Sequence, residues 1–146
     1  MNTLTRSCPP ADASPATPWR DGGGARVLVV EDHPDIRSML RTMLELRGYS
    51  VLEAADGEQG VGVAERELPS LILMDASLPR LDGLAATRRI RAHASLKAVP
   101  VVFLSGHAQP ALRAEAMLSG GDDFLVKPVP LAELERVLER HLGKSV

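Results

Sequence analysis

The sequence predicts an α/β fold in which a parallel β-sheet carries helices on both faces. From Arg26 onward, short and almost wholly apolar runs alternate with longer segments of helical periodicity. A strand buried on both faces is a continuous apolar run, whereas a half-exposed strand alternates apolar and polar residues. Five apolar runs, each followed by a helical segment, therefore predict five parallel strands joined by right-handed crossovers.

The five predicted strands are short segments separated by turn residues. The second strand closes at the turn pair Asp56-Gly57, and the third is followed by Asp75 and a break at Pro79 and Gly83. In chain order, the predicted strands are residues 26–30, 50–55, 71–74, 99–104 and 124–126.

Five helices are predicted from apolar residues that recur on one helical face. The first has Pro34 in its first turn and Gly48 at its end, and the last opens at Pro130. The second is predicted to be weak, because Gly60 and Gly62 each cost roughly 1 kcal/mol relative to alanine. The predicted helices are residues 34–48, 58–67, 84–94, 110–120 and 130 onward. The apolar faces of the first and last helices are formed by Ile36, Leu40, Met43 and Leu44, and by Leu131, Leu134, Leu138 and Leu142.

Length, composition and charge indicate one ordinary globular domain. The chain has 146 residues, of which 45% are hydrophobic and 25% charged, and its formal net charge is -2. No nucleic-acid partner is expected from this charge. We interpret the basic residues around the third helix as a solvated face. These residues are Arg88, Arg89, Arg91, His93 and Lys97.

The N-terminal part of the chain differs from the rest in composition. Residues 1–25 are rich in Pro, Gly and small polar residues and are predicted to be a disordered extension, whereas residues 26–144 form the domain. The alternative is a docking peptide anchored by Trp19, the only tryptophan. No apolar run approaches the ~18–20 residues that cross a bilayer, and the single cysteine, Cys8, fits a reducing compartment. A cytoplasmic protein without a membrane partner is expected.

Polar residues stand at the carboxyl ends of four of the five predicted strands. They are Glu31 and Asp32 after the first strand, Asp75 after the third, Ser105 after the fourth and Lys127 after the fifth. Ligands of an open parallel sheet bind beyond the carboxyl ends of its strands. Three carboxylates, a hydroxyl and an ammonium group are therefore expected at one edge.

Three carboxylates at close quarters repel one another, so at least one would have a raised pKa unless a cation is bound. Mg²⁺ takes a few carboxylates and a carbonyl and keeps several waters. A carboxylate nucleophile, a divalent metal and donors for phosphoryl oxygens are the groups that phosphoryl transfer requires. The alternative, that each acid merely caps a following helix, is common for one acid but disfavoured for three acids beside Lys127.

Four segments together resemble the receiver domain of two-component response regulators, of the single-domain chemotaxis type. The segments are "VVED", "LILMDASLPRLDG", "VFLSGHA" and "GGDDFLVKP". The resemblance extends from about Arg26 to Leu142 in the order and spacing of the family. It implies a flavodoxin-like, doubly wound (βα)5 fold with a five-stranded parallel sheet in the order 2-1-3-4-5.

The resemblance also implies roles for individual residues in phosphorylation and switching. Asp75 matches the phospho-acceptor, and Lys127 matches the lysine that contacts the phosphoryl group. Ser105 matches the switch hydroxyl, and Phe124 stands at the aromatic switch position. The Lys127-Pro128 bond matches a peptide bond that is cis in the family.

The resemblance implies a metal site and two tuning positions as well. The implied ligands of Mg²⁺, with Mn²⁺ as an alternative ion, are Asp32, Asp75, the backbone carbonyl of Ser77 and, through a water, Glu31. Ser77 and His107 occupy the two variable positions that influence phosphate lifetime in the family.

Several residues depart from the family pattern or invite another role. Ser70, Gly106 and Val129 replace common family residues, and none of them touches the phosphorylation chemistry. Phe124 lacks a hydroxyl, so packing alone would decide its position. His33 could meet a metal but is interpreted as a first-turn helix residue, and His141 as a residue that suits the helix dipole.

Three competing functions fit the sequence less well. A nucleotide binder needs a glycine-containing phosphate loop after the first strand, where this chain has "EDHPD". A phosphatase with an aspartyl nucleophile usually has a second Asp two residues later, where this chain has Ser77. A receiver that binds partners without phosphorylation would not need the acids and Lys127.

The expected function is a response regulator receiver that is phosphorylated on Asp75 and is not an enzyme beyond phosphorylating and dephosphorylating itself. The expected partners are a histidine kinase or phosphotransfer protein and a downstream protein target. A phosphorylation-dependent dimer through the fourth helix, fifth strand and fifth helix is a further option. Because the chain ends at Val146, no output domain is expected; the alternative is a relay module from a hybrid kinase.

Overall fold

The computed structural model describes residues 25–143 and contains one sheet of five parallel strands. The strand order is β2-β1-β3-β4-β5, which confirms the predicted fold class and topology. The strands are β1 (Arg26–Val30), β2 (Ser50–Ala54), β3 (Leu71–Asp75), β4 (Val101–Ser105) and β5 (Asp123–Val126). The predicted extension lies outside the described residues except for Ala25, which is buried and whose carbonyl accepts a hydrogen bond from Ser50.

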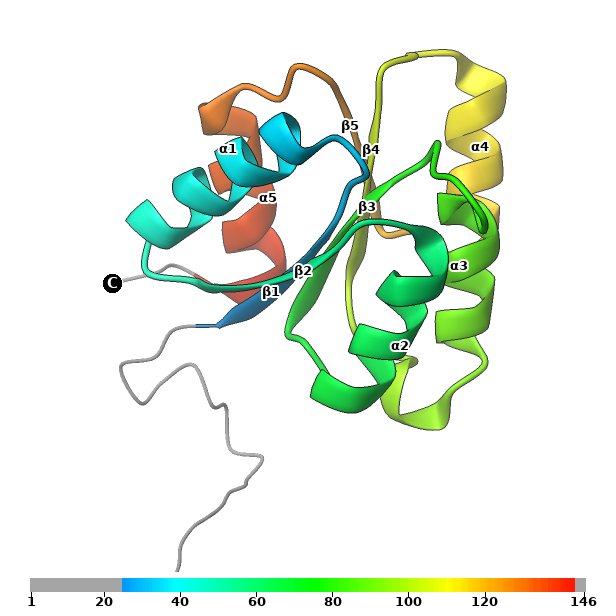
Figure 1. The fold of residues 1–146 in the computed structure, drawn as a ribbon. Helices are drawn as coiled ribbons and strands as arrows, with labels where there is room; N and C mark the ends of the chain where they lie inside the picture. The colour runs from blue at the N-terminus through cyan, green and yellow to red at the C-terminus, as the bar shows by residue number, and fades with distance from the viewer. Residues whose placement is uncertain (1–24, 144–146) are drawn as a thin grey trace, which may run out of the picture.

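Helices cover both faces of the sheet (Figure 1). Helices α1 and α5 pack on one face, and α2, α3 and α4 pack on the other. The helices are α1 (Pro34–Leu46), α2 (Gly57–Glu67), α3 (Gly83–Arg91), α4 (Pro110–Leu118) and α5 (Leu131–Leu142), with a short 3₁₀ helix, η2 (Ala94–Leu96), before β4. No helix within residues 25–143 has the length and apolar character needed to cross a bilayer.

Each central strand contributes side chains to two cores. Val27 and Val29 face α1 and α5, whereas Leu28 and Val30 face the opposite core, and all four are fully buried. Burying a Val or Leu side chain stabilises the fold by roughly 1.5–3 kcal/mol. This two-sided burial explains why the strands are continuous apolar runs.

Helix α2 forms over eleven residues despite the two glycines that predict a weak helix. A Cβ on Gly60 would lie 3.0 Å from the methyl groups of Val30, so the glycine allows α2 to pack closely on β1. Asp56 caps the helix by accepting a hydrogen bond from the Gln59 backbone N–H at 2.8 Å. Packing and capping together offset the low helix propensity of the glycines.

Helix α5 buries a face that differs slightly from the predicted one. Val137 is buried beside Leu134 and Leu138, whereas Leu131 is 40% exposed. His141 lies in the last turn, and its Nε2 is also 2.8 Å from a carboxylate oxygen of Asp123. This contact ties the end of α5 to the start of β5.

The prediction that the basic residues form a solvated face is wrong for Arg91. Its guanidinium donates hydrogen bonds to the carbonyl oxygens of Gly120 (2.8 and 3.0 Å), Leu96 (3.0 Å) and Val99 (2.6 Å). It also forms an ion pair with Asp122 at 2.7 Å, and its side chain is only 20% exposed. Arg91 therefore joins α3 to the loops before β4 and β5.

We expect Arg91→Ala to lower the free energy of unfolding by about 2 kcal/mol, because it leaves several half-buried carbonyls without their donor. Urea unfolding followed by circular dichroism measures this loss. The matched control is Arg88→Ala in the same helix, where the side chain is exposed and a change within about 0.5 kcal/mol is expected. Equal stabilities of the two variants would contradict this role of Arg91.

Candidate functional site

The carboxyl edge of the sheet brings together side chains from β1, β3 and β5. Glu31, directly after β1, is fully buried, and Asp75, the last residue of β3, is 3% exposed. The Nζ atom of Lys127, directly after β5, lies 2.7 Å from Glu31 Oε1 and 2.9 Å from Asp75 Oδ2. The predicted convergence of these acids with a lysine is therefore present in the fold.

The loop after β3 orients the carboxylate of Asp75. Its Oδ1 atom accepts a hydrogen bond from the backbone N–H of Ser77 at 3.0 Å. Asp82 caps α3 by accepting from the backbone N–H of Ala85 at 2.9 Å. Gly83 packs against the backbone of Asp75, because a Cβ on Gly83 would lie 2.1 Å from the Asp75 carbonyl oxygen. The loop thus returns directly over the end of β3.

We expect Gly83→Ala to destabilise the protein by about 2 kcal/mol, because the added methyl group would overlap a backbone atom that cannot move freely. Thermal unfolding measures the change. The control is Gly62→Ala in α2, where the nearest atom to a Cβ is the tip of Arg66 at 3.5 Å. That substitution is expected to stabilise the helix by roughly 0.5–1 kcal/mol. A loss of stability in both variants would refute the close-approach explanation.

Burial and the central lysine move the pKa values of the cluster in different directions. Burial raises the pKa of Asp75, although hydrogen bonds from Ser77 and Lys127 oppose it. Burial also acts to raise the pKa of Glu31, but hydrogen bonds from Lys127 and His33 outweigh it, and that pKa is lowered. For Lys127, burial acts to lower the pKa, and the hydrogen bonds to both acids raise it overall. The ammonium group is therefore held in its charged form between two acids.

His33 lies beside the acids and not in the first turn of α1. It is the N-cap residue of α1, and its side chain makes no capping hydrogen bond. Its Nδ1 atom lies 3.1 Å from Glu31 Oε2 and 3.3 Å from Asp32 Oδ1. The hydrogen bond to Glu31 raises the pKa of the imidazole. In the sequence, the only signal for these contacts of His33 was its position directly after two acids. The direction of an N-cap side chain depends on the fold.

The residues at this edge fit a divalent cation. Among the buried side-chain nitrogen and oxygen atoms of residues 25–143, Asp32 Oδ1 is the one that has no hydrogen-bond partner. One ligand atom each from Glu31, Asp32, His33 and Asp75 can be chosen so that all lie within 4.8 Å of one another. Three carboxylates and one ammonium group leave a formal charge of −2, which a divalent cation would neutralise. Carboxylate oxygens are the ligands that Mg²⁺ prefers.

Ser105 and Lys127 are linked through the backbone of the neighbouring strands. The Ser105 hydroxyl accepts a hydrogen bond from the His107 N–H at 3.0 Å, and the Ser105 carbonyl accepts one from the Lys127 N–H at 2.7 Å. The Lys127-Pro128 peptide bond is cis, as the resemblance implied. Ser105 is 3% exposed, whereas His107 is exposed.

Phe124 is held by more than apolar packing. It is 5% exposed and belongs to the core beneath α4. The guanidinium carbon of Arg113, from α4, lies 5.7 Å from the centre of the Phe124 ring, which is within cation–π range. The expectation that packing alone positions this ring is therefore wrong, because a charged residue also contacts it.

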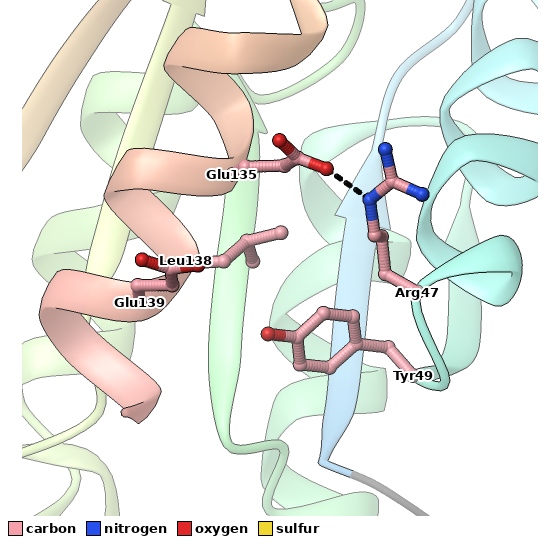
Figure 2. A pocket seen from close by; sticks show the side chains of 5 residues that line it. All are labelled: Arg47, Tyr49, Glu135, Leu138 and Glu139. Atoms are coloured by element: carbon pink, nitrogen blue, oxygen red, sulfur yellow. Dashed lines mark hydrogen bonds and ion pairs between the residues drawn. The ribbon is translucent and has the colours of Figure 1, made fainter. Parts of the chain in front are cut away.

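A separate small pocket lies between the end of α1 and α5 (Figure 2). Its volume is about 90 Å³, and Arg47 pairs with Glu135 across it. The pocket is lined by Arg47, Tyr49, Glu135, Leu138 and Glu139. None of the acids at the carboxyl edge of the sheet lines this pocket, so it is not part of the candidate site.

Known proteins of one family are similar to this chain in sequence and fold. A family model described as the response regulator receiver domain matches residues 27–139. The receiver domain of sensor histidine kinase PA1611 from Pseudomonas aeruginosa, solved with a magnesium ion coordinated in its active-site cleft, is 42% identical. The superposition covers 83% of this chain and 99% of that chain, with a TM-score of 0.78.

Two curated relatives differ in how much of their own length is matched. Protein PilH of Pseudomonas aeruginosa is 38% identical over 105 residues, which cover 72% of this chain and 87% of PilH. The probable transcriptional regulator ycf27 of Porphyridium aerugineum is 36% identical over 110 residues, which cover 75% of this chain and 45% of that protein. The chain thus spans about half the length of some relatives and most of others. The match over residues 27–139, together with the fold and strand order, shows that the chain belongs to the response regulator receiver domain family.

Proposed function

We propose that this receiver accepts a phosphoryl group on Asp75 from a phosphohistidine of a histidine kinase or phosphotransfer protein. The observation that carries the proposal is the position of Lys127 Nζ, within 3 Å of both Asp75 and the buried Glu31. A half-buried lysine between two acids is well placed to replace its contact with a carboxylate oxygen by a contact with a phosphoryl oxygen. The similarity to a receiver domain that binds magnesium in its active-site cleft supports a metal-dependent site in this chain.

In the proposed reaction, a carboxylate oxygen of Asp75 attacks the phosphorus atom of the donor. The O–P bond forms as the P–N bond of the phosphohistidine breaks, and the donor imidazole leaves with the electron pair. Lys127 then binds a phosphoryl oxygen, and the hydroxyl of Ser105 binds another. Transfer onto Asp75 makes this a phospho-accepting signalling protein, with no turnover of an outside substrate.

The metal that we propose for this site is Mg²⁺, with Mn²⁺ as an alternative. When bound, it would neutralise charge that develops on the phosphoryl oxygens. Asp32, Asp75 and the backbone carbonyl of Ser77 would hold it directly, and Glu31 would act through a water. The buried Oδ1 of Asp32, which accepts no hydrogen bond, supports this assignment.

We further propose that the output is a protein contact through α4, β5 and α5. Phosphorylation would draw Ser105 toward the phosphoryl group and shift Phe124, which biases this face toward one of two arrangements. Several apolar side chains are partly or strongly exposed on these elements and support a binding surface or a phosphorylation-dependent dimer. They are Met117, Leu118, Val126 and Leu131.

A second candidate context is a relay module of a hybrid kinase. It is favoured by the similarity to the receiver domain of a sensor histidine kinase, whereas the similarity to PilH favours a stand-alone receiver. Both contexts use the same phosphorylation site and a cytoplasmic location. Transfer from the phosphorylated protein to a purified phosphotransfer domain would favour the relay.

The test of the proposed function is phosphorylation by a small-molecule phosphodonor such as acetyl phosphate. Mass spectrometry is expected to show one added phosphoryl group only when Mg²⁺ is present, with loss of the label in hydroxylamine because an acyl phosphate is labile. Borohydride trapping and peptide mapping should place the label on Asp75. A label on another residue, or one that survives hydroxylamine, would overturn the proposal.

We expect His107→Ala to shorten the lifetime of phosphorylated Asp75 by a few fold. The backbone N–H that binds Ser105 remains in this variant, so only the exposed ring near the switch hydroxyl is lost. Without that ring, water reaches the phosphoryl group more readily. The decay of the phosphorylated protein after removal of the donor measures the effect, and equal lifetimes in both proteins would exclude His107 as a tuning residue.

A further inference from the structure

The ring of His33 occupies a position that is not used by the proposed phosphorylation chemistry. It comes from the N-cap of α1, and its Nδ1 atom faces both acids that follow β1. The side chain is 66% exposed, so core packing does not account for its position. Its contacts are instead with the carboxylates of the proposed metal site.

The spacing of these atoms is that of neighbouring ligands on one ion. Two ligands that occupy adjacent positions of an octahedral cation, each at about 2.1 Å, lie roughly 3 Å apart. Nδ1 of His33 is 3.3 Å from Oδ1 of Asp32, which is proposed to bind the ion directly. It is also 3.1 Å from Oε2 of Glu31, with which it forms a hydrogen bond in the absence of an ion. Asp32 Oδ1 accepts no hydrogen bond, although this ring nitrogen is its close neighbour. A shared cation would satisfy both atoms.

We propose that His33 is a direct ligand of the cation that Asp32 and Asp75 bind, so that the site favours borderline transition-metal ions over Mg²⁺. The inference rests on the metal site of the proposed function and adds a nitrogen ligand, the imidazole of His33, to that site. Imidazole is a poor ligand for the hard ion Mg²⁺ and a good one for Mn²⁺, Co²⁺, Ni²⁺ and Zn²⁺. Coordination uses the Nδ1 lone pair of the neutral ring with its proton on Nε2. When the ring starts doubly protonated, its Nδ1 proton is released to solvent as the ion binds.

The preference follows from the donor set. A site of carboxylates, a carbonyl and water discriminates weakly among divalent ions that prefer oxygen ligands. Exchange of one water for an imidazole nitrogen strengthens binding along the series from Mn²⁺ to Ni²⁺ and leaves Mg²⁺ nearly unaffected. His33 would therefore determine which divalent ion occupies the site when several are present.

The experiment compares metal binding by the wild-type protein, His33→Gln and His93→Ala. Untagged protein with Cys8→Ser is used, so that no added histidines or thiol bind the ions. His93 is the matched control because its ring also pairs with a carboxylate, that of Glu65, at 2.5 Å. It lies at the N-cap of η2 and is not part of the group formed by Glu31, Asp32, His33 and Asp75. Affinities for Mg²⁺ and Co²⁺ are measured by calorimetry at neutral pH.

His33→Gln is expected to bind Co²⁺ about tenfold more weakly and Mg²⁺ within about twofold of wild type. His93→Ala should match wild type for both ions. The electron spin echo of bound Mn²⁺ should show nitrogen modulation that is lost in His33→Gln only. Circular dichroism establishes that each variant is folded, and His33→Asn gives a second variant without a ring.

Three results would overturn the inference in distinguishable ways. If His33→Gln changes the affinities for Mg²⁺ and Co²⁺ by the same factor, His33 only donates hydrogen bonds to the acids. The same conclusion follows if the nitrogen modulation of bound Mn²⁺ persists in His33→Gln. If wild-type protein binds Co²⁺ but Asp32→Asn leaves that binding unchanged, the ion occupies another place. If wild-type protein binds neither ion, the metal site of the proposed function fails together with the inference.

Discussion

Replacing Asp75 with asparagine is expected to abolish phosphoryl acceptance and to stabilise the folded protein at the same time. The amide lacks the charged oxygen that attacks phosphorus, so no label from acetyl phosphate or a phosphohistidine donor is expected. The amide oxygen still accepts a hydrogen bond in the position of Oδ1, so the contact with the Ser77 N–H can persist. Mass spectrometry and thermal unfolding measure the two effects.

The direction of the stability change follows from the raised pKa of Asp75. Because the folded state favours the neutral carboxyl, ionised Asp75 destabilises the fold. This cost begins as the pH rises through the unfolded-state pKa of about 3.9 and is complete above the raised folded-state pKa. A neutral asparagine removes it, so Asp75→Asn should unfold at a higher temperature at neutral pH, and the difference should disappear at low pH.

The matched control for this variant is Asp82→Asn in the same loop. Asp82 is exposed and caps α3, and asparagine is as good an N-cap residue as aspartate. Asp82→Asn should therefore accept the phosphoryl group as the wild type does. The assignment of Asp75 would be contradicted if Asp75→Asn were labelled to the same extent as the wild type, or if Asp82→Asn were not labelled.

Replacing Lys127 with methionine is expected to lower the free energy of unfolding by about 3 kcal/mol at neutral pH, because it leaves Glu31 and Asp75 buried without their cation. Methionine keeps an unbranched apolar side chain of similar length, so the loss is mainly electrostatic. The same variant should be phosphorylated slowly, since the group proposed to bind the phosphoryl oxygen is absent. Urea unfolding over a range of pH measures the stability effect.

The pH range of this loss can be derived from the pKa directions. The lowered pKa of Glu31 means that its stabilising contribution is present above its unfolded-state value and is lost as the pH falls through the folded-state value. The raised pKa of Lys127 means that its contribution is present below its unfolded-state value and is lost as the pH rises through the folded-state value. The defect should therefore be greatest between about pH 5 and pH 10 and should shrink in acid.

Lys97→Met provides the control for removal of a positive charge. Lys97 is exposed after η2, and its loss is expected to change stability by less than about 0.5 kcal/mol. If Lys127→Met were as stable as Lys97→Met at neutral pH, the lysine would not be the cation that balances the two acids.

The fold class was predictable because it depends on local pattern. The predicted strand "LILM" is apolar throughout, and in the structure every residue of β3, including Asp75 at its end, is buried. A sheet covered on both faces is the arrangement that buries such runs. The strand order was implied by the family resemblance and is confirmed by the observed pairing.

The location of the candidate site was predictable for a related reason. Parallel strands all end at the same edge, so residues that follow β1, β3 and β5 meet without further information about side-chain contacts. Glu31, Asp75 and Lys127 meet there with hydrogen-bonding distances.

The contacts of individual side chains depended on neighbours that are remote in sequence. Arg91 looks like part of a solvated basic face, yet its partners at Gly120 and Asp122 are about thirty residues away. From the sequence, Gly60 only weakens its helix, whereas in the structure it allows close packing against Val30. Neither contact has a signature within a few residues of the chain.

The sequence alone was sufficient for the number of strands and helices, for their succession along the chain and for the edge at which the acids gather. These features follow from hydrophobic periodicity and from the common direction of parallel strands, which are properties of short segments. The tertiary structure decided the side-chain directions of His33, Arg91 and Arg113 and the close approach of Gly83 to Asp75. A polar side chain at a helix terminus or on a half-buried face has several low-energy rotamers. Only the elements packed around it determine which one is occupied.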